Sequence, residues 1–426
     1  MKQFITFFCI FITLLLTIGC QQSPETESPK IEVPETQTPE TQAPPTEGLK
    51  YILLDNGTYC VSKGSAGTCE KIVIPSTYNG RKVSKITKDA FYGCNNITEI
   101  VISSGITIID DRAFALCKNL TTITVPDGVT TIGESAFYDC TNLTGIKLPD
   151  SVTEIGDIAF YGCTNLTDIN IPDSVTKIGN IAFGKCTNLT NITIPKDVTE
   201  IGILPFQTCT NLTNITVDKN NQHFSSESGI LFNKNKTTLV SYPAGITATT
   251  YTIPSTVTRI AAGAFDCCTS LTHITIPKGV TVIENRVFYD CQNLINVTIP
   301  DGVTSIESYA FYNCTSLIDI TIPATVSVIG DGVFYGCTSL TNISIPDTVT
   351  NISNETFFGC TNLISISLPD SITTLGLHTF EGCAKLRIIN FGGTVAQWES
   401  IEKLNSWKKD VPARAVTCSD GKVSFS

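Results

Sequence analysis

The sequence predicts a repeat solenoid, a fold in which one short unit recurs and stacks on itself. Three observations predict it. Apolar anchors such as Leu143, Ile146 and Leu148 return at fixed places in every unit. A phenylalanine stands three places before each repeated cysteine, for example Phe137 before Cys140. Those cysteines recur every 23 residues, at 94, 117, 140, 163, 186 and 209 and again at 268, 291, 314, 337, 360 and 383. Self-similarity at a fixed period of this length is typical of solenoids.

Residues 1–20 are expected to be an export signal that takes no part in the fold. Lys2 precedes an apolar run from Phe4 to Ile18, which is shorter than the roughly 20 residues of a membrane-spanning helix. Cys20 directly follows Gly19, as in a bacterial lipobox, whose cysteine carries the membrane anchor. Thr17 occupies the place where that motif has leucine, so lipidation of Cys20 and plain secretion both remain open.

Residues 21–48 are expected to form a disordered acidic tether. The segment consists mainly of Pro, Thr, Glu, Ser and Gln, and it offers almost no apolar side chains whose burial would offset the entropy of ordering. Residues 49–74, which contain Cys60 and Cys69, are expected to cap the first coil.

Residues 75–217 and 253–391 hold the coils. Within a coil, Ile146 and Leu148 alternate with polar or small neighbours, which indicates a short half-buried strand that ends at Pro149. The next segment, 152–160, spaces its apolar residues mostly by three or four, which favours a turn or a short helical piece. One coil buries too little apolar surface to be stable alone, so the coils must stack and their strands must pair in parallel.

Two segments break the rhythm. In residues 218–252, the apolar runs Ile230–Phe232 and Leu239–Tyr242 flank the sequence NKNK, which predicts a β-hairpin island. Residues 392–426 depart from the unit and carry both tryptophans, Trp398 and Trp407, so we expect them to cap the last coil.

The unit LxxIxIPxxVxxIGxxAFxxCxx resembles the leucine-rich repeats known as the Treponema pallidum type, or BspA-like repeats, over roughly residues 70–391. The resemblance implies a right-handed leucine-rich-repeat coil with a parallel β-sheet on the concave face and short helical or irregular segments on the convex face. It also implies a bacterial surface lipoprotein whose role is adhesion or binding of host proteins, and it implies no reaction.

Composition excludes several function classes. The chain of 426 residues has 28 Lys and Arg against 39 Asp and Glu, a net charge of −11, which argues against binding nucleic acid. No motif of a nucleophile with its base and no phosphate-binding loop is present. We therefore predict no enzyme and no cofactor. A secreted enzyme would need a nucleophile and base converging around His223 in the island or Cys418 in the tail.

The 18 cysteines admit three interpretations. We predict that the repeated ones form a buried thiol row, because residues stacked along a parallel ladder lie about 5 Å apart, too far for disulfides. A zinc site is not expected, since zinc needs converging ligands and only three histidines exist. Cys60 and Cys69 are different, because eight residues separate them in an exported cap; a disulfide and two free thiols are both compatible with that spacing.

The outward side of the strands is the candidate binding face. Five and seven places after each cysteine stand mostly Asn, Thr and Ser, which would form two parallel polar rows able to hydrogen-bond a glycan or an extended protein segment. The residues selected for this face are Asp168, Asn170, Asn191, His273, Asn296, Asp319 and Asn342. The alternative is that these side chains only keep a parallel sheet soluble. Tyr289, Tyr312, Tyr335 and Phe358 form a second, aromatic candidate row.

The sequence thus predicts an exported, lipid-anchored surface protein that adheres to a protein or glycan of a host or neighbouring cell. One alternative is a structural or antigenic coat protein with no specific ligand.

Overall fold

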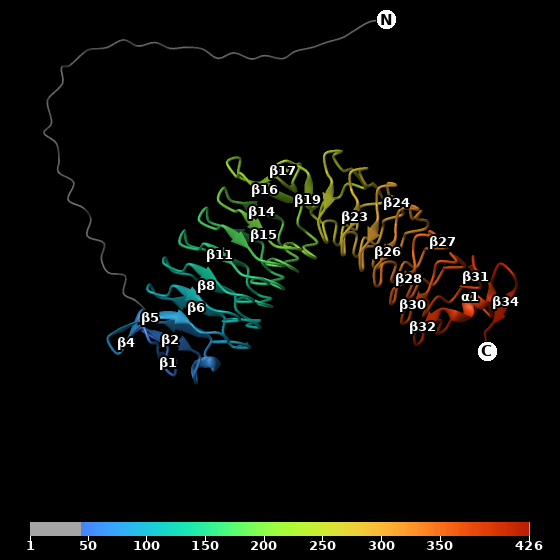
Figure 1. The fold of residues 1–426 in the computed structure, drawn as a ribbon. Helices are drawn as coiled ribbons and strands as arrows, with labels where there is room; N and C mark the ends of the chain where they lie inside the picture. The colour runs from blue at the N-terminus through green and yellow to red at the C-terminus, as the bar shows by residue number, and fades with distance from the viewer. Residues whose placement is uncertain (1–43, 426) are drawn as a thin grey trace, which may run out of the picture. The chain divides into compact units, whose positions relative to one another are not determined.

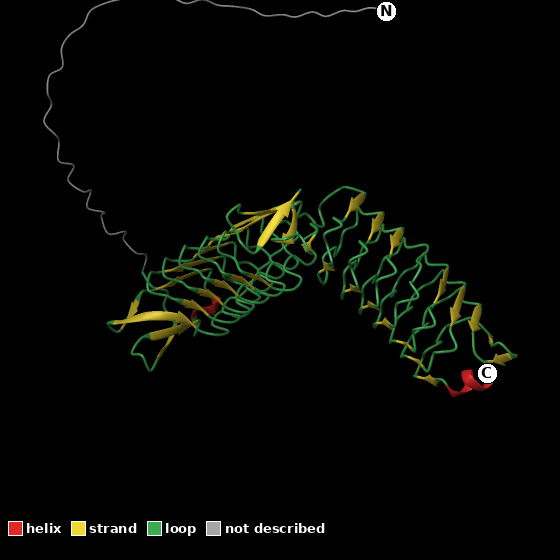
Figure 2. Cartoon of the chain, turned by 45° about the horizontal axis from the view of Figure 1, so that its top comes forward, coloured by secondary structure: helices red, strands yellow, loops and turns green. Residues whose placement is uncertain are grey.

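The described part of the chain is a stack of short coils. The structure is a computed structural model that describes residues 44–425, so the expected signal (1–20), Cys20 and most of the expected tether (21–48) lie outside the described residues. Successive coils lie side by side from the amino-terminal cap to the carboxyl-terminal cap (Figure 1). Figure 2 shows that each coil consists of turns and very short strands. The predicted solenoid is confirmed.

One ladder of parallel strands, here called the long ladder, follows the predicted LxxIxIP segments. Its neighbouring strands pair in register, for example Gly145 with Asp168 and Asn342 with Ser365. The pairing is broken between Asn170 and Asn191, across the island, and at residues 317–323, which have the strand pattern but no strand assignment. Its strands are β3 (Lys71–Ile74), β6 (Glu99–Ile102), β8 (Thr122–Thr124), β10 (Gly145–Lys147), β12 (Asp168–Asn170), β14 (Asn191–Ile194), β16 (Asn214–Val217), β20 (Thr250–Thr252), β22 (His273–Thr275), β24 (Asn296–Thr298), β27 (Asn342–Ser344), β29 (Ser365–Leu368) and β31 (Ile388–Phe391).

A second ladder, here called the short ladder, occupies the segments for which the sequence favoured a turn or short helical piece. The residues before each glycine of the VxxIG motif extend and pair with the same residues of the next coil, as Ile155 does with Ile178. This pairing satisfies backbone groups that a helix would satisfy internally. The short-ladder strands are β5 (Arg81–Ile86), β7 (Ile108–Ile109), β9 (Thr131–Ile132), β11 (Glu154–Ile155), β13 (Lys177–Ile178), β15 (Glu200–Ile201), β21 (Arg259–Ile260), β23 (Val282–Ile283), β25 (Ser305–Ile306), β26 (Val328–Ile329), β28 (Asn351–Ile352) and β30 (Thr374–Leu375).

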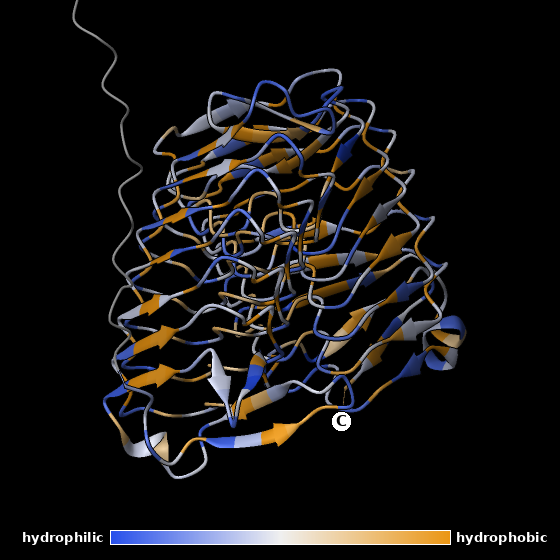
Figure 3. Ribbon diagram, turned by 90° about the vertical axis from the view of Figure 1, so that its left-hand side faces the viewer, coloured by the Kyte–Doolittle hydropathy of each residue, from blue (hydrophilic) through white to orange (hydrophobic). Residues whose placement is uncertain are grey.

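The core between the ladders is built from continuous rows of like side chains. The phenylalanines stack with ring centroids 5.2–6.0 Å apart, in one run from Phe91 to Phe206 and another from Phe265 to Phe380. Apolar strand segments alternate with hydrophilic loops along the stack (Figure 3). Because each row is shared by adjacent coils, every coil covers its neighbours.

The cysteines of the repeat have a specific partner in this core. From Cys117 to Cys209 and from Cys291 to Cys383, each thiol donates to the carbonyl oxygen of the phenylalanine one coil earlier; Cys163 Sγ, for instance, lies 3.2 Å from Phe137 O, and Cys337 Sγ lies 3.2 Å from Phe311 O. Cys268 donates to Tyr242 O instead. A small apolar residue with a weak donor therefore fits this place. The predicted buried thiol row is present, and all described cysteines are free thiols.

Except at the junction between the two runs, each coil is also joined to the next by a backbone hydrogen bond from the residue directly before its cysteine. Asp139 N donates to Tyr161 O at 2.7 Å, and Lys185 N donates to Gln207 O at 2.6 Å. Both donor residues have positive φ, 55° and 57°, so the chain turns tightly here and its N–H points along the stack.

The island interrupts this regularity between the two runs of coils. Strands β18 (Ile230–Asn233) and β19 (Thr238–Ser241) form the predicted antiparallel hairpin, and β17 (Phe224–Glu227) adds a third strand that the sequence did not predict. β19 continues the short ladder by pairing in parallel with β21. Leu231 packs in the core of the first run, whereas Ile230 and Phe232 pack in the core of the second.

Both caps pair with the ladders instead of merely covering them. At the amino end, β1 (Lys50–Leu53), β2 (Tyr59–Ser62) and β4 (Thr77–Tyr78) extend the sheet of β5, and the 3-10 helix η1 (Ala66–Thr68) precedes β3. Thr46 N donates to Val73 O at 3.1 Å, so residues 44–48 of the expected tether belong to the folded unit. At the carboxyl end, helix α1 (Val395–Ser400), β32 (Glu402–Lys403), β33 (Ala415–Thr417) and β34 (Lys422–Ser424) bury Trp398 and Trp407.

The disulfide that the spacing of Cys60 and Cys69 permitted is absent from the structure. Cys60 lies on β2, is buried, and directs its thiol to Ile52 O at 3.5 Å, while Cys69 caps η1 and is half-buried. Both are free thiols because each is placed by its own backbone element.

Candidate binding surface

The long ladder presents the two predicted polar rows to solvent. In β8, β12, β22, β24 and β27 the first and third residues are exposed and the middle residue is buried. This alternation is that of a sheet with one face on the core. In-register pairing then aligns the outer residues of neighbouring coils, so that His273 lies beside Asn296.

The structure brings the seven predicted residues together only in part. Asp168 and Asn170 are the two ends of β12, and Asn191 begins β14. His273 and Asn296 are neighbours in register beyond the island. Asp319 and Asn342 line one shallow groove of about 490 Å³, together with Ser344, Ser365 and Ser367. The predicted face is therefore a series of small polar patches, and Asp319 and Asn342 are the two of the seven predicted residues that line a groove.

Local hydrogen bonds orient several of these side chains. Asn191 Nδ2 donates to Thr190 Oγ1 at 2.9 Å, and Asn342 Oδ1 accepts from Ser365 Oγ at 2.6 Å. His273 Nδ1 lies 2.9 Å from Thr272 Oγ1. Each amide or ring still has polar atoms free for a ligand, since these contacts use only some of its donors and acceptors.

A row of exposed isoleucines beside the polar rows was missed in the sequence. Ile318 is 50% exposed and Ile364 is 41% exposed, and both stand four places after a repeat cysteine. Ile318 and Ile295 line a second shallow groove of about 640 Å³, next to Thr272 and Ser316. The signal was available: this repeat position holds threonine in every coil up to Thr272 and mainly isoleucine from Ile295 onward.

The aromatic row is a packing feature. The rings of Tyr289, Tyr312, Tyr335 and Phe358 stack with centroids 4.5–4.7 Å apart, and the Arg286 guanidinium lies over the Tyr289 ring at 4.6 Å. The ring faces are thus covered by one another, and mainly their edges remain for a ligand.

The buried thiols are unsuited to chemistry. Burial raises the pKa of the Cys117 thiol and of the Cys209 thiol to about 12, so the reactive thiolate is strongly disfavoured. Among residues 44–425, no group of three or more His, Cys, Asp or Glu side chains is placed to hold a metal ion. His223 lies at the island and Cys418 is buried in the carboxyl-terminal cap, where desolvation raises its thiol pKa.

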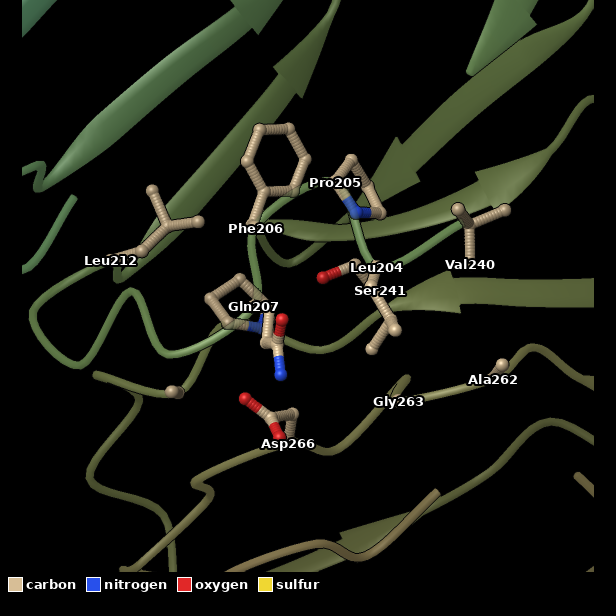
Figure 4. A pocket seen from close by; sticks show the side chains of 12 residues that line it. Leu204, Pro205, Phe206, Gln207, Leu212, Val240, Ser241, Ala262, Gly263 and Asp266 are labelled. Carbon is tan, nitrogen blue, oxygen red and sulfur yellow. The ribbon is translucent and has the colours of Figure 1, made fainter. Parts of the chain in front are cut away.

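A small, partly open pocket marks the junction between the two runs of coils (Figure 4). Its volume is about 10 Å³, enough for one water molecule, and Asp266 borders it. Asp266 is 5% exposed; its Oδ2 accepts from Thr208 N at 2.7 Å and Thr208 Oγ1 at 3.2 Å, whereas its Oδ1 has no hydrogen-bond partner among the described residues. Burial raises the pKa of Asp266 to about 6, although the bonds from Thr208 oppose this shift.

Two ladders around a buried Leu, Ile, Phe and Cys core define the protein as a leucine-rich-repeat solenoid. A family model described as the BspA type leucine rich repeat region matches it in overlapping segments, 63–156, 131–248, 241–338 and 281–402. The chain belongs to this family of bacterial surface proteins. None of the helices within residues 44–425 has the length and apolar character of a membrane span.

Solved structures similar to the chain include three bacterial proteins. A leucine rich cell surface protein from Faecalibacterium prausnitzii is 30% identical, with 84% of this chain and 96% of that chain covered and a TM-score of 0.62. A leucine-rich repeat protein from Eubacterium ventriosum is 26% identical over 89% and 98% of the two chains, with a TM-score of 0.55. The pneumococcal vaccine antigen PcpA shares the fold at 22% identity, covering 88% and 98%, with a TM-score of 0.69. Among curated proteins, none matches the chain significantly.

Proposed function

We propose that this chain is a cell-surface adhesion protein that binds a protein or glycan of a host or neighbouring cell through the outward face of the long ladder. The observation that carries the proposal is the pair of exposed, in-register polar rows, which deepen into a groove at Asp319 and Asn342. Side chains aligned at about 4.8 Å per coil offer many weak hydrogen bonds at once. The similarity to a leucine rich cell surface protein supports the same role.

Alanine replacement of Asn296, Asp319 and Asn342 together is expected to reduce attachment of cells displaying the protein several-fold. These side chains are exposed or line the groove, and none is part of the core, so the fold should persist. Attachment is counted on host-cell monolayers, and circular dichroism checks folding. The matched control is alanine replacement of Lys177, Glu200 and Asn351, which are exposed on the short ladder instead. Unchanged attachment by the folded first variant would favour a coat protein with no ligand on this face.

We further propose that Cys20 is lipidated and anchors the protein in the membrane. The apolar run that ends at Gly19 supports an export signal, and the tether would hold the solenoid away from the lipid. Cys20→Ala is expected to move the protein from the membrane fraction to the medium. Mass spectrometry of the mature amino-terminal peptide provides the direct measurement, and a peptide with an unmodified Cys20 thiol would exclude the anchor.

A further inference from the structure

The exposed isoleucines join adjacent coils through their backbone N–H groups, as Ile364 N does with Thr341 O at 2.8 Å, but their side chains form no hydrogen bond. In the first run, the same repeat position is threonine, whose hydroxyl donates to the backbone one coil earlier: Thr121 Oγ1 reaches Thr98 O at 2.9 Å, and Thr213 Oγ1 reaches Thr190 O at 3.2 Å. Ile318 and Ile364 cannot make this bond and remain about half exposed. Ile295, Ile318 and Ile364, with Thr341 between the last two, thus place apolar side chains beside a groove, and exposed apolar groups that gather in one place can mark an interaction surface.

The same coils have an unusual charge. Between Arg286 and Lys385 the sequence contains no Lys or Arg, but it contains nine acidic residues: Asp290, Asp301, Glu307, Asp319, Asp331, Asp347, Glu355, Asp370 and Glu381. Residues 50–218, by contrast, hold 13 basic and 17 acidic residues. The net charge is therefore −9 for the first segment and 13 − 17 = −4 for the second, longer one.

Four of these carboxylates surround the exposed face of the long ladder. Asp319 lines the groove, and Asp301, Asp347 and Asp370 follow the strand-ending prolines of their coils. All four are exposed, and none forms an ion pair with a described residue. The isoleucine row lies at one end of the strands, and the acids that follow the prolines lie at the other end. Six residues of extended chain separate the two groups, a distance of about 20 Å.

We propose that the face of the coils between Cys291 and Cys383 is a docking surface for a basic polypeptide segment with apolar side chains. The inference rests on the proposed function and names the chemistry of its partner. Isoleucines would bury the apolar side chains of that segment, and the four carboxylates would attract its Lys or Arg residues and speed its association.

The chemistry of this surface favours a polypeptide over a glycan for two reasons. Sugars pack best on open aromatic faces, and the rings of the Tyr289 to Phe358 row cover one another. A sulfated or carboxylated glycan would also be repelled by a face that carries the four carboxylates, in a segment (287–384) that contains no Lys or Arg. Proteins combine apolar side chains with cationic groups. The isoleucines of this surface complement the apolar side chains, and its carboxylates complement the cationic groups.

The test measures binding of fluorescein-labelled synthetic peptides to the whole chain by fluorescence anisotropy. The probes are a peptide of alternating Leu and Lys, one of Leu and Glu, and one of Ser and Lys. The Leu–Lys peptide is expected to bind best, with about tenfold lower affinity at high salt, because exposed charges are screened. Equal binding of the Leu–Glu peptide, or no binding of any of the three, overturns the proposal.

Two variants locate the site. Asp301→Asn with Asp347→Asn and Asp370→Asn is expected to weaken Leu–Lys binding about tenfold, whereas the matched control Asp127→Asn with Asp150→Asn and Asp173→Asn, at the same repeat position of the first run, should not. Ile318→Thr with Ile364→Thr introduces the threonine that the first run already carries, and it should weaken the Leu–Lys peptide but not the Ser–Lys peptide.

Equal affinities of the test and control variants would place the binding elsewhere and overturn the proposal. Failure here is distinguishable from failure of adhesion. If the triple alanine variant loses cell attachment while no peptide binds, the face is adhesive and its ligand is not a basic polypeptide. If attachment is unaffected while the peptide binds as predicted, adhesion fails and the docking surface stands.

Discussion

Gly179→Ala is expected to destabilise the solenoid by about 3 kcal/mol. Gly179 follows the short-ladder strand β13, and a Cβ added there would lie 2.5 Å from the backbone atoms Asp157 N and Gly156 C of the preceding coil. Those atoms are main chain and cannot rotate away, so one coil must separate from the next. The separation would also strain the ladder bonds between β11 and β13.

The matched control for this prediction is Gly145→Ala. Gly145 lies in the long ladder, where an added Cβ meets only Asp168 O at 3.9 Å. Alanine there should leave the stability almost unchanged or raise it slightly, because glycine has the more flexible unfolded chain. Urea unfolding followed by circular dichroism measures both variants. Equal stabilities of the Gly179→Ala and Gly145→Ala variants would show that adjacent coils separate without cost, contrary to the close approach of Gly179 to the preceding coil.

Asp266→Asn is expected to change how stability depends on pH. In the regular coils, the backbone carbonyl of the residue two places before a cysteine accepts a hydrogen bond from an N–H group of the preceding coil. Asp266 occupies this repeat position. At the junction, however, it is the side-chain carboxylate of Asp266 that accepts the hydrogen bond from Thr208 N–H. Burial raises the pKa of Asp266 from 3.8 to about 6, so folding favours the protonated form. Asp266 therefore contributes about 3 kcal/mol to the free energy of unfolding below pH 3.8, and this contribution is lost as the pH rises through about 6.

The difference between wild type and Asp266→Asn isolates this group from the other acids. At pH 7.5 the variant should be more stable by up to about 3 kcal/mol, and near pH 4 the two should converge. The groups facing Asp266 are Thr208, Cys267 and Arg286, and Asn keeps an oxygen that accepts from Thr208. Thermal unfolding of both proteins at several pH values provides the measurement. A constant difference from pH 4 to pH 7.5 would contradict a buried, titrating carboxyl at the junction.

The sequence by itself determined the coil and everything that repeats with it. A 23-residue period with Phe, Cys, Leu and Ile at fixed places requires stacking, since those side chains find enough apolar contact only in the next coil. The buried thiol row, the polar outer residues of β22 and β24 and the hairpin of β18 and β19 follow from local patterns of that kind.

Only the tertiary structure decided the features that depend on how one coil lies on the next. The short ladder exists because the residues before Gly156 and Gly179 meet their counterparts edge to edge, which no local period reveals. Likewise, Asp266 reaches Thr208 only because the island displaces its coil, and Cys60 stays apart from Cys69 because each follows its own strand or turn. The change from threonine at Thr272 to isoleucine at Ile295 was visible in the sequence. Only the fold decided that the isoleucines at this repeat position lie at the surface beside unpaired carboxylates.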